Sequence, residues 1–386
     1  MNLEVLPQGA NLRRLPQISP GDGPYILKNG RRILNLGSND YLGLSSDRDL
    51  FQSFLSSGGL DFSVAGHLMG SGASRLLGGG GDEFHRLEED LARWQGREAA
   101  LLFNSGYHAN LGVLSALAGP GDRIFLDQFC HASLMDGARL SGARIHRFNH
   151  QDITHLESLL TIGEGAGRRT FVVTEGLFSM DGDEGALEPL IQLKEHHDFF
   201  LVVDEAHSIG LYGQGGRGMV SGLSSPLAVD LVVGTFGKSF CSQGAFALCS
   251  YHVKQILVNR ARTLIFSTAL SPFSVLWTRF ILGKMDDFES RRERLFSLSG
   301  LLSLGLRQKG WPSDTRGPIL PLVLGTNEKA LKMGSILEEK GYFTPVIRPP
   351  TVPDHTSRLR FSLRGDMDVP EVESLIGCIP FPGDEL

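Results

Sequence analysis

Asp204 and Lys238 each stand where a predicted buried strand ends, and together they can hold an aromatic cofactor. Asp204 follows the apolar run 199–203, and Lys238 lies among small residues in the stretch 234–239, just after a second run. A buried lysine is rare without a function, and a desolvated lysine is a nucleophile toward carbonyls. A carboxylate beside a pyridine nitrogen keeps that nitrogen protonated. The pair therefore predicts a pyridoxal-phosphate site, although Lys238 alone would fit a surface turn equally well.

Further residues at strand ends fit the same cofactor. His207 lies three residues after Asp204, where it could bind the ring's phenolic oxygen. Gly106 opens a helix directly after a strand, so backbone N–H groups there could bind the phosphate, as they do at helix N-termini. His131 could stack on the ring, and Ser179 could reach its polar edge. Taken singly, each position also fits an ordinary turn or a structural histidine.

The stretch Asp204-Glu-Ala-His207 also occurs in ATP-binding helicases, but the rest of the chain does not support that function. A phosphate-binding loop of the form G-x-x-x-x-G-K-[ST] is required. Gly237-Lys238-Ser239 would need a glycine at position 232, which is valine. The glycine-rich stretch 70–81 lacks a preceding strand. We therefore expect no nucleotide site.

Strands and helices alternate from residue 85 to about residue 270. Predicted strands at 99–103, 123–126, 171–174, 199–203 and 231–233 are continuously apolar, and helical stretches separate them. This pattern is typical of an α/β fold with a mostly parallel sheet that is covered on both faces. Ligands of such sheets bind beyond the carboxyl ends of the strands. We expect an N-terminal segment 1–45, a large domain 46–284 and a smaller α+β domain 285–386.

Bulk composition excludes several classes of function. The formal net charge is −6 and the longest basic runs are Arg-Arg pairs, so we expect no nucleic-acid partner. Apolar runs are too short for a membrane span, and residues 1–14 lack the apolar core of a signal peptide. The four cysteines show no metal-ligand spacing. We expect a cytoplasmic protein with reduced thiols and no metal.

Ten sequence blocks resemble the α-oxoamine synthases, a pyridoxal-phosphate family with the aspartate-aminotransferase type of fold (fold type I). The blocks are SNDYLGL (38–44), GSGASRLLGG (70–79), HRLE (85–88), NSGYHAN (104–110), HASL (131–134), TEGLFSMDGD (174–183), VDEAHSIGLYG (203–213), GTFGKSF (234–240), FSTALSP (266–272) and IRPPTVP (347–353). The resemblance runs from about residue 12 to about residue 364.

The resemblance implies a set of cofactor-binding residues and a homodimer. Lys238 would form the imine, Asp204 would face the ring nitrogen, and His131 would stack on the ring and act in catalysis with them. The residues that the match places around the cofactor are Gly106, Tyr107, His131, Ser179, Asp204, His207, Thr235, Lys238 and Thr268. Thr268 would reach the phosphate of the neighbouring subunit, which implies shared active sites.

The family joins an amino acid to an acyl thioester, loses carbon dioxide and releases an α-amino ketone. The residues that the match places around the substrates are Arg13, Asn39, Arg348, Thr351 and Arg360. Asn39 and Arg360 would bind the amino-acid carboxylate, and Arg13 would face the acyl chain. The blocks at 266–272 and 347–353 favour the branch that uses alanine over those that use glycine. The acyl carrier, coenzyme A or a carrier protein, stays open.

The sequence departs from the family pattern at two places, and two other functions stay open. Only twelve residues precede Arg13, where the family has a longer helix, and Ser239 replaces the usual glycine or alanine. A sister synthase that uses glycine or serine with another acyl chain is one alternative. A non-catalytic partner subunit is the other, but such subunits typically lose the lysine that is present here as Lys238.

Overall fold

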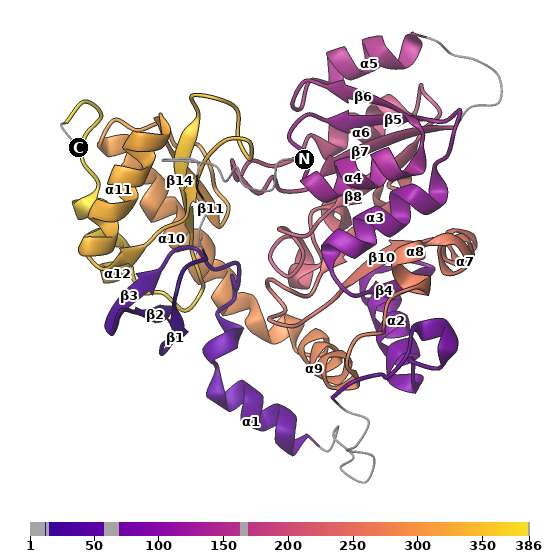
Figure 1. Ribbon diagram of the computed structural model, residues 1–386, viewed down its shortest axis with the longest axis horizontal. Helices are drawn as coiled ribbons and strands as arrows, with labels where there is room; N and C mark the ends of the chain where they lie inside the picture. The colour runs from indigo at the N-terminus through magenta and orange to yellow at the C-terminus, as the bar shows by residue number, and fades with distance from the viewer. Residues whose placement is uncertain (1–11, 13–14, 58–68, 163–168, 385–386) are drawn as a thin grey trace. The chain divides into compact units, whose positions relative to one another are not determined.

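The computed structural model describes residues 12, 15–57, 69–162 and 169–384 (Figure 1). The chain forms two compact units, each assembled from separate parts of the sequence. Unit 1 comprises Met1–Asp47, Ser179–Asp183 and Ser290–Leu386, and unit 2 comprises Arg48–Phe178 and Glu184–Glu289. The expected domain boundaries after residues 45 and 284 stay a prediction about which parts fold independently.

Unit 2 is built on one sheet of seven strands. Their order is β4-β10-β9-β8-β7-β5-β6. The strands are β4 (Ala99–Phe103), β5 (Arg123–Asp127), β6 (Arg144–Phe148), β7 (Thr170–Glu175), β8 (Phe200–Asp204), β9 (Leu231–Thr235) and β10 (Ala245–Cys249). Only β10 runs against its neighbours, because it pairs antiparallel with both β4 and β9. The predicted mostly parallel α/β sheet is confirmed.

Burial explains why these segments are strands. Every residue of β4, β5, β7, β9 and β10 is buried, so both faces of the sheet are covered. Strands buried on both faces are mainly apolar, and the polar residues of β5 and β7 stand at the ends of these strands. In the parallel part of the sheet, the carboxyl ends meet at one edge, where Glu175 of β7 pairs in register with Asp204 of β8.

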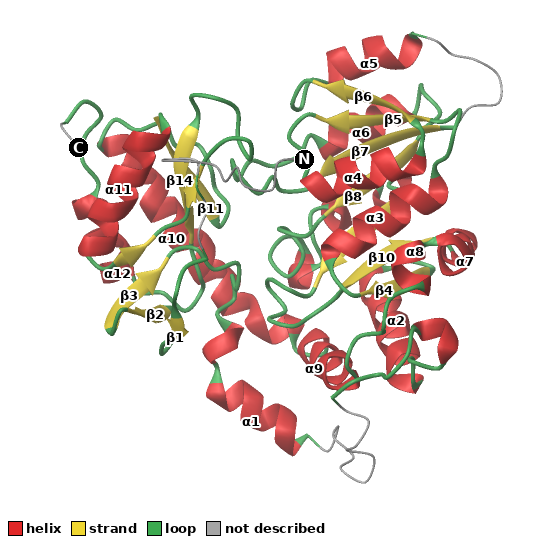
Figure 2. Cartoon of the chain, viewed as in Figure 1, coloured by secondary structure: helices red, strands yellow, loops and turns green. Residues whose placement is uncertain are grey.

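Helices surround this sheet (Figure 2). They are α2 (Asp82–Gln95), α3 (Gly106–Leu117), α4 (Ala132–Ser141), α5 (Ile153–Thr161), α6 (Leu187–Lys194), α7 (Tyr251–Arg260), α8 (Arg262–Ile265) and α9 (Pro272–Leu282). Helix α1 (Arg48–Ser56) lies apart from the sheet, and its Phe54 packs on Trp277 of α9. Helices α3 and α4 pack on each other, and Val113, Leu114 and Leu134 join the sheet residues in one core. This packing fixes the amino ends of α3 and α4 beside the carboxyl edge of the sheet.

Unit 1 contains two small sheets and three helices among its described residues. One sheet has the order β1-β2-β3-β12 and the other β11-β14-β13. The strands are β1 (Ser19–Pro20), β2 (Tyr25–Lys28), β3 (Arg31–Asn35), β11 (Ile319–Gly325), β12 (Tyr342–Phe343), β13 (Val346–Ile347) and β14 (Ser357–Ser362), and the helices are α10 (Glu289–Gln308), α11 (Asn327–Glu339) and α12 (Val369–Cys378). No helix in the described parts of the chain has the length and apolar character to span a membrane.

Glu205 anchors the loop that follows β8. Its side chain is fully buried, and its Oε1 accepts hydrogen bonds from the Val220 N–H at 2.9 Å and the Ser208 hydroxyl at 3.2 Å. A Cβ at Gly218, where φ is +90°, would lie 2.0 Å from Oε2, so only glycine fits there. Burial raises the pKa of Glu205 to about 7, although these hydrogen bonds act in the opposite direction.

We predict that the free energy of unfolding falls as pH rises, because the buried carboxyl of Glu205 loses its proton. The pKa of Glu205 is higher in the folded protein than in the unfolded chain, so its contribution is fully present below about pH 4.5 and is lost as pH rises through about 7. Glu205→Gln mimics the protonated carboxyl. It should match the wild type near pH 4.5 and exceed its free energy of unfolding at pH 8 by on the order of 3 kcal/mol.

Denaturant unfolding at several pH values between 4.5 and 8.5 measures this difference. Glu373→Gln, which changes an exposed carboxylate on α12, is the matched control and should follow the wild type. Parallel stability curves for the wild type and Glu205→Gln would show that Glu205 does not titrate in this range.

Candidate active site

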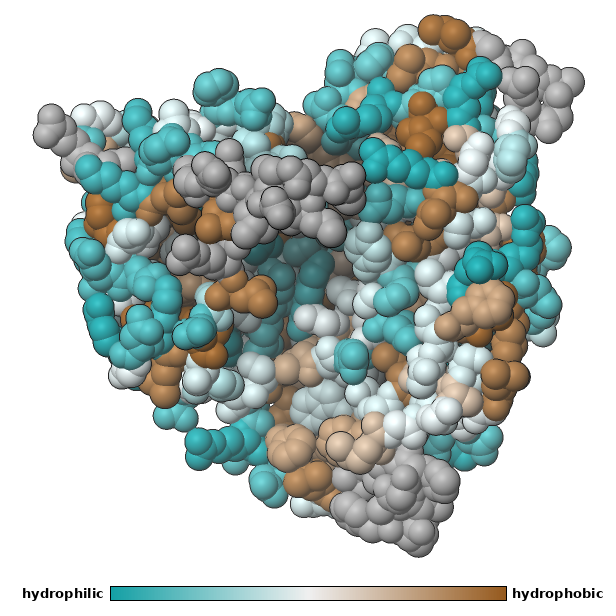
Figure 3. Space-filling view, in the orientation of Figure 1, coloured by the Kyte–Doolittle hydropathy of each residue, from teal (hydrophilic) through white to brown (hydrophobic). Residues whose placement is uncertain are grey.

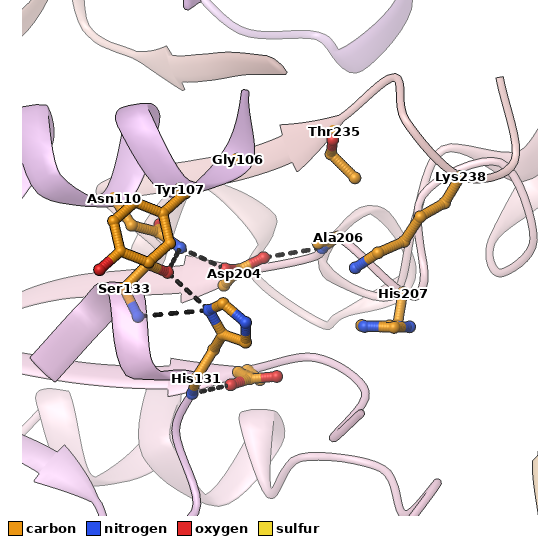
Figure 4. A pocket seen from close by; sticks show the side chains of 11 residues that line it. Gly106, Tyr107, Asn110, His131, Ser133, Asp204, Ala206, His207, Thr235 and Lys238 are labelled. Atoms are coloured by element: carbon orange, nitrogen blue, oxygen red, sulfur yellow. Dashed lines mark hydrogen bonds between the residues drawn. The ribbon is translucent and has the colours of Figure 1, made fainter. Parts of the chain in front are cut away.

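A pocket of about 200 Å³ lies at the carboxyl edge of the unit 2 sheet (Figure 4). Its lining residues come from the ends of β7, β8 and β9 and from the segments that follow β4, β5, β8 and β9. They are Gly106, Tyr107, Asn110, His131, Ser133, Glu175, Asp204, Ala206, His207, Thr235 and Lys238. Seven predicted cofactor residues therefore meet in one place, namely Gly106, Tyr107, His131, Asp204, His207, Thr235 and Lys238.

Asp204 presents a buried carboxylate to this pocket. Its side chain is 5% exposed. Oδ1 accepts a hydrogen bond from the Ala206 N–H at 2.8 Å, and Oδ2 accepts one from Asn110 Nδ2 at 2.7 Å. Both donors are neutral, so they fix the carboxylate without neutralising it. A cationic ring nitrogen in the pocket would offset the cost of burying this charge.

Lys238 lies in a tight turn directly after β9. The Cys241 N–H donates to the Lys238 carbonyl at 2.8 Å, and the Ser242 N–H donates to the Phe236 carbonyl at 2.8 Å. The lysine is half-buried rather than buried, and Figure 4 shows its side chain extending toward Ala206 and His207. The primary amine therefore faces the same pocket as the Asp204 carboxylate.

Ser239 is fully buried, and a Cβ at Gly210, where φ is +84°, would lie 2.5 Å from the Ser239 Cβ. Glycine at position 210 therefore leaves room for a side chain at position 239. The Ser239 hydroxyl is buried without a hydrogen-bond partner, so nothing in the structure explains why serine stands there.

The amino end of α3 offers main-chain N–H groups to the pocket. Ser105 caps this helix by accepting from the His108 N–H, and Gly106 is the first helical residue. A Cβ at Gly106 would lie 3.7 Å from the Thr235 Cβ, so an alanine would narrow the space between them. The Tyr107 hydroxyl donates to Asp136, so its phenol is engaged outside this space. First-turn N–H groups bind phosphates well.

His131 caps the amino end of α4 with its own ring. Its Nδ1 accepts from the Ser133 N–H, and its main-chain N–H donates to Glu175 Oε1. Burial lowers the pKa of His131 and Lys238 lowers it further, against the attraction of Asp204 and Asp136. Burial and the charge of Asp204 raise the pKa of Glu175 well above its ordinary value. A neutral imidazole therefore lines the pocket.

Four lining residues were missed by sequence reasoning: Asn110, Ser133, Glu175 and Ala206. All four lie inside blocks quoted above, at 104–110, 131–134, 174–183 and 203–213. For Glu175 and Ala206, a position at or next to the end of a strand was a usable signal. Asn110 and Ser133 carried no such signal. Their role depends on contacts between α3 and α4, which no spacing along the chain reveals.

Thr268 lies in unit 2 but is not among the residues that line this pocket. It is exposed, its carbonyl accepts from Asn104 Nδ2 at 2.7 Å, and it forms an isolated β-bridge with Ser74. Its hydroxyl is therefore not part of the site formed by its own chain.

Unit 1 brings together three other predicted residues, Arg360, Asn39 and Ser179. Arg360 on β14 is 5% exposed. Its Nε donates to the Ser179 carbonyl at 2.6 Å, and its Nη2 donates to Asn39 Oδ1 at 3.1 Å. The remaining partners are the Tyr41 and Ser362 hydroxyls. Burial raises the pKa of Tyr41 to about 12, so all these partners are neutral and the buried cation can accept a carboxylate.

The other predicted substrate residues also belong to unit 1. The Thr351 N–H donates to the Arg348 carbonyl at 3.0 Å, and Arg348 Nη2 donates to the Leu12 carbonyl at 3.5 Å. Arg13 lies outside the described residues. Within the parts of the chain that the structure describes, no group of three or more His, Cys, Asp or Glu residues could hold a metal ion.

The unit 2 pocket fits pyridoxal phosphate by the chemistry of its groups. An amine that can form an imine, a buried carboxylate and the amino end of a helix surround one space. These groups match the aldehyde, the ring nitrogen and the phosphate of that cofactor in turn.

Comparisons with known proteins agree with this chemistry. The family Aminotransferase class I and II matches residues 31–379. A Haemophilus ducreyi protein named 8-amino-7-oxononanoate synthase is 44% identical over 381 residues, covering 97% of this chain and 98% of that protein.

Two solved structures share the fold. A serine palmitoyltransferase from S. paucimobilis, solved with a bound pyridoxal-phosphate–myriocin aldimine, has a TM-score of 0.87 at 29% identity and covers 94% of this chain and 91% of its own. An 8-amino-7-oxononanoate synthase from Francisella tularensis has a TM-score of 0.76 at 28% identity, covering 90% of this chain and 96% of its own.

The predicted fold type I architecture and the predicted family are thereby confirmed. The chain belongs to the aminotransferase class I and II family and, within it, to the pyridoxal-phosphate-dependent α-oxoamine synthases, which are acyltransferases.

Proposed function

We propose that this protein condenses L-alanine with a pimeloyl thioester and releases carbon dioxide, forming 8-amino-7-oxononanoate in biotin biosynthesis. The observation that carries the proposal is the 44% identity, over 97% of the chain, to the Haemophilus ducreyi protein of that name. The pocket supports the same chemistry, since Lys238 and Asp204 face one space from neighbouring strand ends.

Bound pyridoxal phosphate supplies a protonated ring that accepts electron density from the α carbon of the amino acid. Lys238 would attach the cofactor covalently, and the Asp204 carboxylate would keep the ring nitrogen protonated. The first-turn N–H groups at Gly106 and Tyr107, together with Thr235, would hold the phosphate. His131 would stack on the ring. The remaining proposed contacts, to the ring's polar edge, come from His207 and Ser179.

The chain's own groups would perform the proton transfers. The Lys238 amine, displaced when the amino acid binds, is the base that removes the α proton and later returns one. Its anchoring in the turn after β9 holds the amine within reach of the substrate. Asp204 contributes by keeping its negative charge beside the ring nitrogen throughout.

Arg360 and Asn39 would bind the carboxylate of the amino acid. Arg360 is a buried cation whose partners are neutral, so a substrate carboxylate would supply the missing negative charge. A carboxylate held there would be oriented for loss as carbon dioxide. Arg348 and Thr351 would lie near the reacting substrate, and Arg13 would face the acyl chain.

A sister reaction with serine or glycine is the second candidate. The observation in its favour is the fold match to serine palmitoyltransferase, which has a TM-score of 0.87. Product mass distinguishes the two reactions, because each amino acid leaves a different side chain on the amino ketone. The acyl carrier is coenzyme A or an acyl carrier protein in either case.

We further propose a cytoplasmic homodimer with shared active sites. Thr268 is exposed and would contact the phosphate bound to the neighbouring subunit. Unit 2 also exposes large apolar side chains, including Leu77 at 82% and Phe266 at 69%. Figure 3 shows tan and brown residues mixed with teal and white ones over the region that Figure 1 labels α7 and α8. A second copy would cover such side chains.

The first prediction is that Lys238→Ala abolishes product formation. The wild type with pyridoxal phosphate, L-alanine and pimeloyl-CoA should yield the mass of 8-amino-7-oxononanoate, whereas Lys238→Ala should retain cofactor and form at least about a thousandfold less product, since both nucleophile and base are lost. Lys284→Ala, which removes a lysine that contacts Asp287 and the Phe280 ring and does not line the pocket, is the control. Normal turnover by Lys238→Ala would refute the assignment.

The second prediction concerns Arg360. Arg360→Lys keeps the positive charge but loses the planar guanidinium, which can bind a carboxylate through two parallel hydrogen bonds. KM for L-alanine should therefore rise roughly 10- to 100-fold. KM for the acyl thioester should change little. Arg307→Lys, at an exposed position on α10, is the matched control. An unchanged KM for L-alanine in Arg360→Lys would exclude Arg360 from carboxylate binding.

A further inference from the structure

A continuous chain of hydrogen bonds joins Asp204 to His131 (Figure 4). Asn110 Nδ2 donates to Asp204 Oδ2 at 2.7 Å and to Ser133 Oγ at 2.9 Å. Ser133 Oγ lies 2.7 Å from His131 Nδ1. Asn110 and Ser133 are 2% and 0% exposed, so water does not compete for these bonds. The proposed partner of the ring nitrogen and the proposed stacking residue are thus linked through the protein.

The charge of Asp204 fixes the direction of every proton in this chain. An ionised carboxylate can only accept, so Asn110 must turn its NH₂ group toward Asp204. The same group then donates its second proton to Ser133, whose oxygen must accept. The single hydroxyl proton of Ser133 is left for His131 Nδ1. Asn110 Oδ1 is buried without a hydrogen-bond partner. The orientation of the Asn110 amide therefore satisfies Asp204 but leaves its own oxygen unsatisfied.

The backbone of α4 independently requires an unprotonated Nδ1. His131 is the N-cap of this helix, and its Nδ1 accepts from the Ser133 N–H at 3.3 Å. A protonated Nδ1 would point a proton at this donor. The positive end of the helix dipole also disfavours an imidazolium at this position. Two donors of Ser133, the N–H and the O–H, therefore converge on one acceptor nitrogen.

We propose that the negative charge of Asp204, acting through Asn110 and Ser133, fixes His131 as the neutral tautomer that carries its proton on Nε2. Asn110 and Ser133 are then positioning residues, since they act on the site only through His131 and Asp204. Figure 4 shows the second ring nitrogen of His131 on the side away from Ser133. His131 therefore offers the pocket a hydrogen-bond donor rather than an acceptor or a cation.

Charged groups around His131 are compatible with this state. Lys238 disfavours the imidazolium, whereas Asp204 and Asp136 favour it, and burial outweighs them so that the pKa of His131 is lowered. Glu175 Oε1 accepts the main-chain N–H of His131. The catalytic use of the Nε2 proton, donation to an oxygen of the substrate, rests on the proposed function. The tautomer itself does not.

The ¹⁵N resonances of the histidine rings test the proposal directly. The full-length chain is labelled with ring-¹⁵N histidine and measured between pH 5.5 and 8.5, before and after pyridoxal phosphate is added. The His131 signals are assigned by their loss in His131→Asn. The wild type should show a protonated Nε2 and an unprotonated Nδ1 near pH 7.

Ser133→Ala should raise the pKa of His131 by on the order of one half to one unit, the size expected when one neutral hydrogen bond to the unprotonated nitrogen is lost. It should also weaken the preference for Nε2–H. Ser133→Thr keeps the hydroxyl and should restore the wild-type signals. Ser115→Ala is the matched control, because Ser115 on α3 donates only to the Leu111 carbonyl of its own helix.

Asp204→Asn should weaken the preference for Nε2–H, because an amide at position 204 no longer forces the orientation of Asn110. The Ser133 N–H still donates to Nδ1, so Nε2 should remain the main site of protonation. A wild-type His131 protonated on Nδ1 would overturn the proposal. So would wild-type His131 signals at every pH in a folded Ser133→Ala. Neither result would bear on the product of the reaction, which the Lys238→Ala assay tests separately.

Discussion

The buried negative charge of Asp204 is the constraint on which the rest of the site depends. A carboxylate that is 5% exposed and bonded only to neutral donors is costly to fold. That cost is offset when a cation binds in the pocket, and the proposed cation is the protonated ring nitrogen of the cofactor. The same charge orients Asn110, and through Ser133 it reaches His131 on another helix. One carboxylate, at the end of β8, thus organises residues that follow two other strands, β4 and β5.

The parallel sheet makes this arrangement possible. Strand ends meet at one edge, so Glu175, Asp204 and Thr235 arrive together from β7, β8 and β9. The helices that follow β4 and β5 bring their amino ends to the same edge. Each supplies what a strand end cannot, namely unpaired N–H groups at Gly106 and a capping imidazole at His131. Unit 1 contains a buried charge of the opposite sign, because Arg360 is a buried cation whose hydrogen-bond partners are neutral.

Much of this could be predicted from the sequence. The strands β4, β5, β7, β8 and β9 were recognisable as apolar runs, and the residues at their ends identified the cofactor site. β10 was missed because its five apolar residues follow a glycine-containing turn and carry no periodic signal. β6 was missed because it is an edge strand, in which Arg144 and Arg147 are exposed. Edge strands need not be apolar, so hydrophobic patterning does not find them.

The hydrogen bonds that link Asp204 to His131 could not be predicted from the sequence, for a different reason. Asn110 and Ser133 are separated by 23 positions and meet only because α3 packs on α4. The engagement of the Tyr107 hydroxyl by Asp136 is a similar case, because the two residues lie on those same helices. Residue types at strand ends reveal which chemistry a site can perform. The partners that orient those residues are set by tertiary packing.

The most direct test of the central claim is to locate the covalent bond to the cofactor. The purified chain with pyridoxal phosphate should show a visible absorbance that borohydride abolishes, and digestion should then give one peptide bearing the reduced cofactor at Lys238. This result is expected because the Lys238 amine faces the pocket that Asp204 lines. A reduced cofactor on another lysine, or a folded chain with no such absorbance, would contradict the account.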